Sequence, residues 1–232
     1  MRSRWLPVLV ALGLVVPSGR APAQAETRPG IAVLPIHNGG SYGQSKEDFD
    51  ALEQGLAAML MSELAANPAA RVVERQQLQR LIEEQNLGAS GRVEEATAAR
   101  IGKLVGARYV VKGTFVDFYG DFRLDLHLVN GETGEVVKTV SERMRRDHLF
   151  DIIKAAAQRL MKETNLPPLS QGTQQQRMNR QIPTEALTFY SKGLLYQDRG
   201  DRQRAAEMFQ KAIDVFPEYA EARDGLQRLG PA

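Results

Sequence analysis

The fold is decided by residues 109–142, which read YVVKGTFVDFYGDFRLDLHLVNGETGEVVKTVSE. The first ten residues are rich in β-branched and aromatic side chains, and from Phe122 to Leu128 apolar residues alternate strictly with polar ones. This alternation is typical of strands with one buried face. Two short turns, Tyr119–Asp121 and Asn130–Gly134, separate the runs, so we expect an antiparallel meander. Its predicted strands are 109–118, 122–129 and 135–142.

On the N-terminal side, strand and helix patterns alternate. The short apolar run Ile31–Ile36 predicts a buried strand, and Arg71–Arg75 predicts a brief one. Apolar residues at helical spacing predict four helices, at 48–66, 76–85, 93–104 and 149–163. Residues 30–165 are therefore predicted to form one α/β (α+β) domain, a mixed β-sheet with an antiparallel meander covered by helices on at least one face.

After this domain the composition changes. Residues 166–183 contain Pro167-Pro168 and a glutamine run, which predicts a flexible linker. Residues 184–230 resemble a single tetratricopeptide repeat (186–219) followed by a capping helix, a small all-α hairpin. The residues at repeat spacing are Gly193, Tyr196, Ala205, Phe209, Ala212 and Pro217, with Gly200-Asp201 as the interhelical turn.

A single repeat cannot bury its own apolar face, since about three repeats are normally needed for stability. It must pack on the α/β domain, pair with a second copy or dock to a partner. We predict a partner-binding surface on the face that repeats usually present to ligands, if this face is exposed. The alternative, that its side chains pack within the chain, is equally open. The face carries Leu187, Tyr190, Leu194, Gln197 and Asp198.

Residues 1–25 have the pattern of an export signal. Two arginines precede the apolar run Trp5–Val16, and Ala23-Gln-Ala25 offers a small-x-small cleavage site. The run is too short to span about 30 Å of hydrocarbon. The segment holds three of the 30 basic residues and no acid, so the remainder has 27 basic and 28 acidic residues. We therefore expect an exported protein, in the periplasm or peripheral to the outer membrane, without a nucleic-acid partner.

The composition also limits the chemistry. The chain has no cysteine, which excludes disulfides, thiolate nucleophiles, thiolate metal sites and a cysteine-linked lipid anchor. Its three histidines, His37, His127 and His148, are far apart in sequence. The glycine-containing loop His37–Gly43 lacks both the GxGxxG spacing and a following Lys-Ser/Thr. We predict no catalytic, cofactor-binding or metal-binding residues, no cofactor and no enzymatic activity.

Six short motifs within residues 30–165 occur in the same order in a known family. They are Ile31-Ala-Val-Leu-Pro35, Gly55-Leu-Ala-Ala-Met-Leu60, Val72-Val-Glu-Arg75, Leu81-Ile-Glu-Glu-Gln-Asn-Leu87, Gly106-Ala-Arg-Tyr-Val-Val-Lys-Gly113 and Gly131-Glu-Thr-Gly-Glu135. On these residues the chain resembles the curli-secretion (CsgG-type) family of curli production assembly/transport components. The resemblance implies the soluble α/β scaffold of that family.

Channels of this family are outer-membrane pores to which each subunit contributes two long amphipathic hairpins. Here only residues 119–121 and 144–146 occupy the corresponding places, whereas a membrane strand needs about 9–11 residues. We therefore predict no transmembrane strands. The expected function is a non-enzymatic periplasmic component that acts as a scaffold for protein–protein interaction, with envelope proteins or further copies of this chain as partners. An outer-membrane secretion channel subunit and a regulatory activator of an envelope enzyme are the alternatives.

Overall fold

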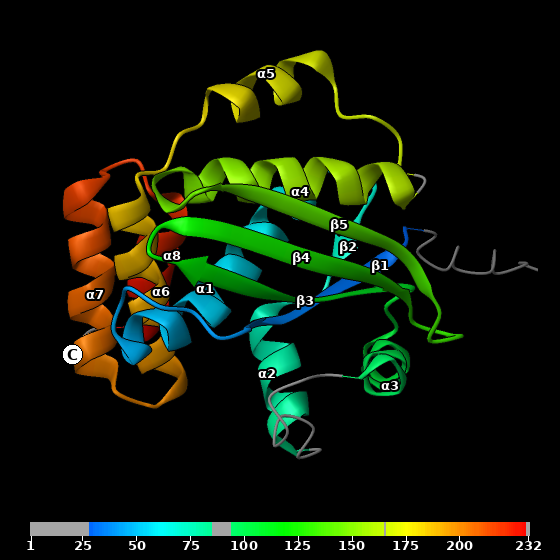
Figure 1. Ribbon diagram of the computed structural model, residues 1–232, viewed down its shortest axis with the longest axis horizontal. Helices are drawn as coiled ribbons and strands as arrows, with labels where there is room; N and C mark the ends of the chain where they lie inside the picture. The colour runs from blue at the N-terminus through cyan, green and yellow to red at the C-terminus, as the bar shows by residue number, and fades with distance from the viewer. Residues whose placement is uncertain (1–27, 85–93, 165, 231–232) are drawn as a thin grey trace, which may run out of the picture.

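The computed structural model describes residues 28–84, 94–164 and 166–230; the predicted export signal, residues 1–25, lies outside them. A five-stranded sheet in the order β2-β1-β3-β4-β5 forms the centre of the molecule (Figure 1). Its strands are β1 (Gly30–Asn38), β2 (Arg71–Val72), β3 (Tyr109–Phe118), β4 (Asp121–Asn130) and β5 (Val136–Arg145).

The sheet is mixed, as predicted. Strand β1 runs parallel to both β2 and β3, while β3, β4 and β5 form the expected antiparallel meander. Only Tyr119 and Gly120 separate β3 from β4, and β5 continues directly into the short helix η1 (Arg146–His148). The strand predicted at 71–75 is shorter than expected, because helix α2 (Arg75–Glu84) already begins at Arg75.

Helices cover the two faces of the sheet unequally. On one face, α1 (Lys46–Ala65) packs on β1 and α4 (Leu149–Glu163) packs on β4 and β5. On the other face, α3 (Glu95–Val105) contacts β3 and β4 near one end only. In Figure 1, α4 runs alongside β5 and α3 lies below β3. Within the described ranges, no helix is both long and apolar enough to cross a membrane.

Helix α1 is the centre of the core. Ser45 caps its first turn in a reciprocal capping box with Asp48, which fixes where the helix begins. Its apolar residues cover most of its circumference rather than one stripe, an arrangement typical of helices buried on more than one side. The buried apolar residues of α1 are Phe49, Ala51, Leu52, Leu56, Ala57, Met59, Leu60, Met61 and Leu64.

The second side of α1 is covered by helix α6 (Thr184–Asp198), and Ser62 of α1 also contacts Glu221 of α8 (Ala220–Leu229); helix α7 (Arg202–Val215) packs on α6 and α8. Helices α6 and α7 form an antiparallel hairpin whose connection contains Gly200 and Asp201. A Cβ added to Gly193 would lie 2.4 Å from the ring of Phe209, so only glycine allows the two helices to approach this closely. That the hairpin is a tetratricopeptide repeat stays a prediction.

Residues 166–183, expected to be a flexible linker, instead contain helix α5 (Gln171–Asn179). The segment is tied to the end of α1 by charge rather than by apolar burial. Arg177 Nη2 lies 2.7 Å and Arg180 Nη1 3.6 Å from Oε1 of Glu63, which is buried. The sequence-based prediction missed this ordered segment because it relied on the low content of apolar residues and not on the charged residues.

Glu221 at the start of α8 links the same segment to α1. Its carboxylate accepts a 2.5 Å hydrogen bond from Ser62 Oγ and pairs with Arg180. Burial alone would raise the pKa of Glu221, but the hydrogen bonds from Arg180 and Ser62 outweigh it and hold the pKa below the ordinary value of 4.5. The ionised carboxylate therefore stabilises the folded state.

We expect the Glu221 interaction to be present above pH 4.5 and to be lost as the pH falls through the lower, folded-state pKa. Glu221→Gln should lower the free energy of unfolding at pH 7 by about 1–3 kcal/mol. The difference between wild type and variant should shrink as the pH is lowered from 5 toward 3, roughly the range set by a depressed carboxyl pKa. Urea unfolding at several pH values measures this, and a difference that stays constant across this range contradicts it.

The contact between α1 and α6 gives a second prediction. A Cβ on Gly55 would lie 1.7 Å from Oγ of Ser191, which is fully buried. Gly55→Ala should therefore destabilise the protein by about 1–3 kcal/mol, although alanine is the better helix former. The double variant Gly55→Ala, Ser191→Gly should recover most of the loss. Chemical denaturation measures all three proteins.

Gly172→Ala in α5 is the matched control, because nothing lies within 4 Å of the added methyl group. It should leave stability unchanged or raise it by up to about 1 kcal/mol. If Gly55→Ala behaves like this control, α6 does not press on α1 as described.

Candidate protein-interaction surface

The predicted partner-binding face of α6 is not a free surface. Leu187, Tyr190 and Leu194 are 0%, 4% and 2% exposed. They belong to the continuous core that joins α1 to the C-terminal helices. The expectation of an exposed contact surface is thus corrected in favour of the other reading, packing within the chain. The physical reason is that α1 has a second apolar side, which needs a cover.

The polar residues of this face are also engaged. Arg75 Nη1 donates to both carboxylate oxygens of Asp198 at 2.8 Å, and its Nη2 donates to Gln197 Oε1 at 3.2 Å. Burial raises the pKa of Asp198, and the neighbouring Arg75 opposes that rise. Gln197 and Asp198 therefore fasten α6 to the start of α2 and are not available to a partner.

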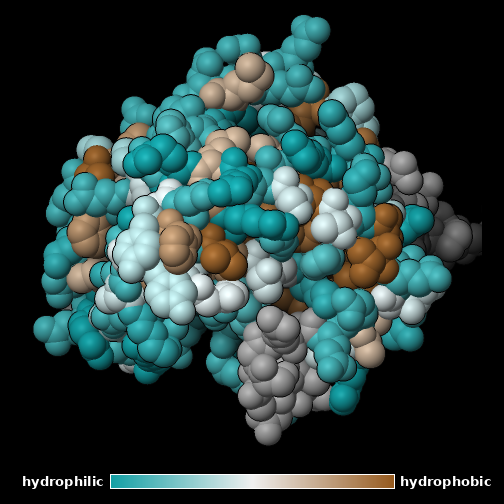
Figure 2. All heavy atoms as spheres, in the orientation of Figure 1, coloured by the Kyte–Doolittle hydropathy of each residue, from teal (hydrophilic) through white to brown (hydrophobic). Residues whose placement is uncertain are grey.

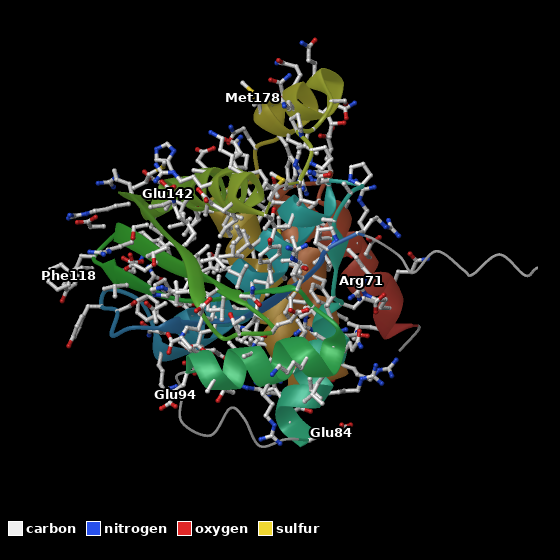
Figure 3. All side chains as sticks on the ribbon, turned by 90° about the vertical axis from the view of Figure 1, so that its right-hand side faces the viewer. Arg71, Glu84, Glu94, Phe118, Glu142 and Met178 are labelled. Carbon is white, nitrogen blue, oxygen red and sulfur yellow. The ribbon has the colours of Figure 1, made fainter. Side chains whose placement is uncertain are left out.

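Three exposed rings instead gather where the β1–α1 loop meets the β3–β4 turn, and we call them the aromatic cluster. It consists of Tyr42 from the β1–α1 loop, Phe118 at the end of β3 and Tyr119 in the β3–β4 turn. These residues are 60%, 59% and 73% exposed, respectively. The Tyr42 and Phe118 rings meet edge-on at 6.0 Å, and the Phe118 and Tyr119 rings at 5.1 Å. Figure 2 shows pale and brown side chains gathered over these two segments, and in Figure 3 Phe118 projects away from the body.

The backbone beneath the aromatic cluster is held firmly. Tyr42 N donates to Asp117 O at 2.7 Å, and Tyr119 N donates to Tyr42 O at 3.1 Å. The fully buried Asp117 carboxylate accepts a 2.7 Å hydrogen bond from Gly120 N and pairs with Arg146 Nη1 at 2.5 Å. These contacts join the loop, the turn and η1, so the exposed rings stand on a fixed support.

Tyr119 adopts an unusual conformation. Its φ is +51° and that of Gly120 is +93°. A two-residue hairpin turn with positive φ at both positions normally has Asn, Asp or Gly first, because other side chains are strained there. Such strain is typical of sites where a side chain is positioned for function.

A polar sheet face adjoins the aromatic cluster. His37, Thr114, Asp125 and Ser141 are register partners across β1, β3, β4 and β5. Asp125 accepts hydrogen bonds from Ser141 Oγ at 2.6 Å and from Arg123 Nε at 2.8 Å. Helices α1 and α4 pack on the sheet through β1 and through β4 and β5, respectively.

Near the start of α3 the polar sheet face is hollowed by a cleft of about 360 Å³. His37, Lys112 and His127 contribute to its lining. Lys112 Nζ lies 2.6 Å from Glu95 Oε1, and its hydrogen bond lowers the pKa of Glu95. The described residues contain no group of three His, Cys, Asp or Glu side chains placed to hold a metal ion.

The surface as a whole has the anatomy of a protein-binding site. Interface centres are enriched in Tyr and Phe and surrounded by a polar rim. Here the three exposed rings lie beside a polar rim in which positive and negative side chains are paired, such as Arg143–Asp121 and Arg145–Asp147. The sequence placed Tyr42 in a loop and Tyr119 in a turn, but not side by side. A tyrosine before glycine in a two-residue turn was the one local signal.

Replacing Tyr119 separates its role in stability from its role on the surface. Tyr119→Asn relieves strain of about 1 kcal/mol, while losing an edge contact between exposed rings of about 0.5 kcal/mol. We expect the free energy of unfolding to stay the same or to rise slightly. Urea denaturation is the measurement, and a loss above about 1 kcal/mol would show that the Tyr119 ring is a structural element.

Three solved structures show similar arrangements at low identity. The LpoB C-terminal domain from Salmonella enterica is 21% identical with a TM-score of 0.36, and the match covers 53% of this chain and 87% of that one. Lipoprotein GNA1162 from Neisseria meningitidis is 14% identical with a TM-score of 0.36, covering 50% and 79%. A PelC dodecamer from Paraburkholderia phytofirmans is 16% identical with a TM-score of 0.33, covering 63% and 94%. No curated protein matches this chain.

The sequence model of one family does match. It is described as curli production assembly/transport component CsgG, and it aligns with residues 15–123, which end at the start of β4. Over residues 15–123 this chain therefore carries the sequence pattern of the CsgG family, and the resemblance drawn from the motifs is confirmed there.

Proposed function

We propose that this chain is a non-enzymatic scaffold of the cell envelope, which acts in the periplasm by binding other proteins through the aromatic cluster. The observation that carries the proposal is that three large rings stay exposed on a backbone held by the buried Asp117 and its ion pair with Arg146. Burying apolar surface is favourable, so a rigid aromatic group left in water is a ready contact for a partner.

Two sequence features support the envelope as the location. Residues 1–25 have the pattern of an export signal. The matching family model is described as an assembly and transport component. Together they favour a role in assembling or exporting other molecules, with the chain itself as the binding element.

The charges around the aromatic cluster favour a protein partner over a nucleic acid. Arg143 is paired with Asp121 and Arg145 with Asp147. Arg146, next to them, is paired with Asp117. Nucleic-acid sites instead gather unpaired cations against phosphates. A near-neutral aromatic patch with a polar rim is the pattern of protein interfaces.

Site-specific photo-cross-linking tests the proposal in cells that export the protein. A benzophenone amino acid at position 118 should give one or a few discrete adducts with envelope proteins. The matched control is position 104, because Leu104 is 53% exposed, close to the 59% of Phe118, but lies on α3. Tyr42→Ser should weaken the adducts from position 118.

Identical adducts from positions 118 and 104, or no adduct from 118, would contradict the aromatic cluster as the docking element. The mass of each adduct also separates the roles. An adduct of two copies of this chain indicates self-assembly, and an adduct with an enzyme indicates a regulatory scaffold.

A further inference from the structure

A second hollow lies on the opposite side of the molecule from the polar sheet face and has different chemistry. It is a cleft of about 550 Å³ between α4, the end of α1 and the strap, by which we mean residues 166–178. In Figure 1 the strap, with α5, arches above α4. Its volume lies within the range of about 300–1,000 Å³ that is usual for small-molecule sites.

Most of the cleft surface is apolar. Ala157 and Met161 on α4 form the floor, and Leu166, Leu169 and Met178 on the strap form the wall and roof. Met178 is 59% exposed although it is a large apolar residue. Methionine adapts its shape easily to apolar ligands, and two of the five side chains named here are methionines. The cleft therefore suits a flexible hydrocarbon chain better than a rigid polar molecule.

The charged residues of the lining are mostly cations. Lys154, Lys162 and Arg177 stand against a single acid, Glu63. Arg177 Nε donates to Glu63 Oε2 at 3.0 Å. Glu63 Oε1 is 2.7 Å from Arg177 Nη2 but accepts no well-directed hydrogen bond, so that contact is mainly one of charge. The acid is thus already neutralised by its own partner.

The two lysines differ in availability. Lys154 Nζ donates to the carbonyl of Arg180 at 3.0 Å and lies 3.0 Å from an oxygen of Asp151. Lys162 is exposed, and in the part of the chain that the structure describes it makes no hydrogen bond or ion pair. The ammonium group of Lys162 is therefore available to bind an anion at the rim of the cleft.

We infer that this cleft binds a single-chain anionic amphiphile, with the acyl chain between α4 and the strap and the carboxylate or phosphate head group at Lys162. Charge complementarity selects this occupant, because the lining combines apolar walls with an excess of positive charge and one unpartnered ammonium group. The inference does not rest on the proposed function, since the cleft shares no residue with the aromatic cluster.

Binding of 11-dansylaminoundecanoate to the purified protein tests the inference, with the probe kept below its micellar concentration and its fluorescence as the signal. Laurate and dodecyl phosphate should both displace the probe, whereas dodecyltrimethylammonium should not. Lys162→Glu should raise the dissociation constant of the probe at least about tenfold, which corresponds to the loss of one charge-assisted hydrogen bond. Met178→Asp should also weaken it, by placing a second anion beside the chain.

Lys46→Glu is the control for the charge change, because Lys46 is also exposed but lies at the start of α1 and does not line the cleft. It should bind the probe like wild type. Both test positions are on the surface, so unchanged urea unfolding curves are expected for both variants.

Three results with the amphiphiles and the Lys162 variant would overturn the inference. They are no saturable binding of the probe, equal displacement by the anionic and cationic amphiphiles, and unchanged binding by Lys162→Glu. Displacement by an apolar peptide but not by laurate would also overturn it and would identify the cleft as a peptide groove. If only dodecyl phosphate or only laurate competes, the inference stands and the head group is narrowed to one.

Discussion

The structure depends on the burial of helix α1 from two sides. One side packs on the sheet, and the other packs on α6 and contacts Tyr219 and Glu221 at the start of α8. Gly55 makes the second contact possible, because the space a methyl group would need is filled by Ser191. Around this close approach lie Tyr219, whose hydroxyl donates to Met59 Sδ at 3.2 Å, and the pair Lys192–Asp48 at 2.6 Å.

This arrangement explains which parts of the fold could be predicted. Alternation of apolar and polar residues predicted the meander, and helical spacing predicted α1 and α4. The resemblance to a tetratricopeptide repeat predicted the C-terminal hairpin. Whether the apolar face of α6 is exposed or buried could not be predicted from the spacing of its own residues. Leu187 and Tyr190 look like a contact surface when α6 is considered alone, and they become core once α1 is placed against them. The continuous apolar circumference of α1 was the available signal.

The aromatic cluster was harder to predict because it is assembled across 76 residues of sequence, between Tyr42 and Phe118. Its backbone hydrogen bonds join a loop to a turn, and neither segment has a periodic pattern. Residues 166–183 were also hard to predict. Arg177 and Arg180 hold this segment by pairing with the buried Glu63 on α1, whereas composition alone favours an unstructured segment.

Because α1 is buried on two sides, the chain can complete its fold only when its C-terminal helices are present. Met59 and Tyr219 are 160 positions apart, and the partners of the early helix are among the last residues of the chain. Contacts so distant along the sequence form slowly, because a long loop must close first. We propose that the chain is exported, and a chain that crosses a membrane with its N-terminus leading exposes the apolar helix α1 until its C-terminal helices have arrived. Such a molecule depends on being shielded during transit, and a truncation near its end leaves the most apolar helix in water.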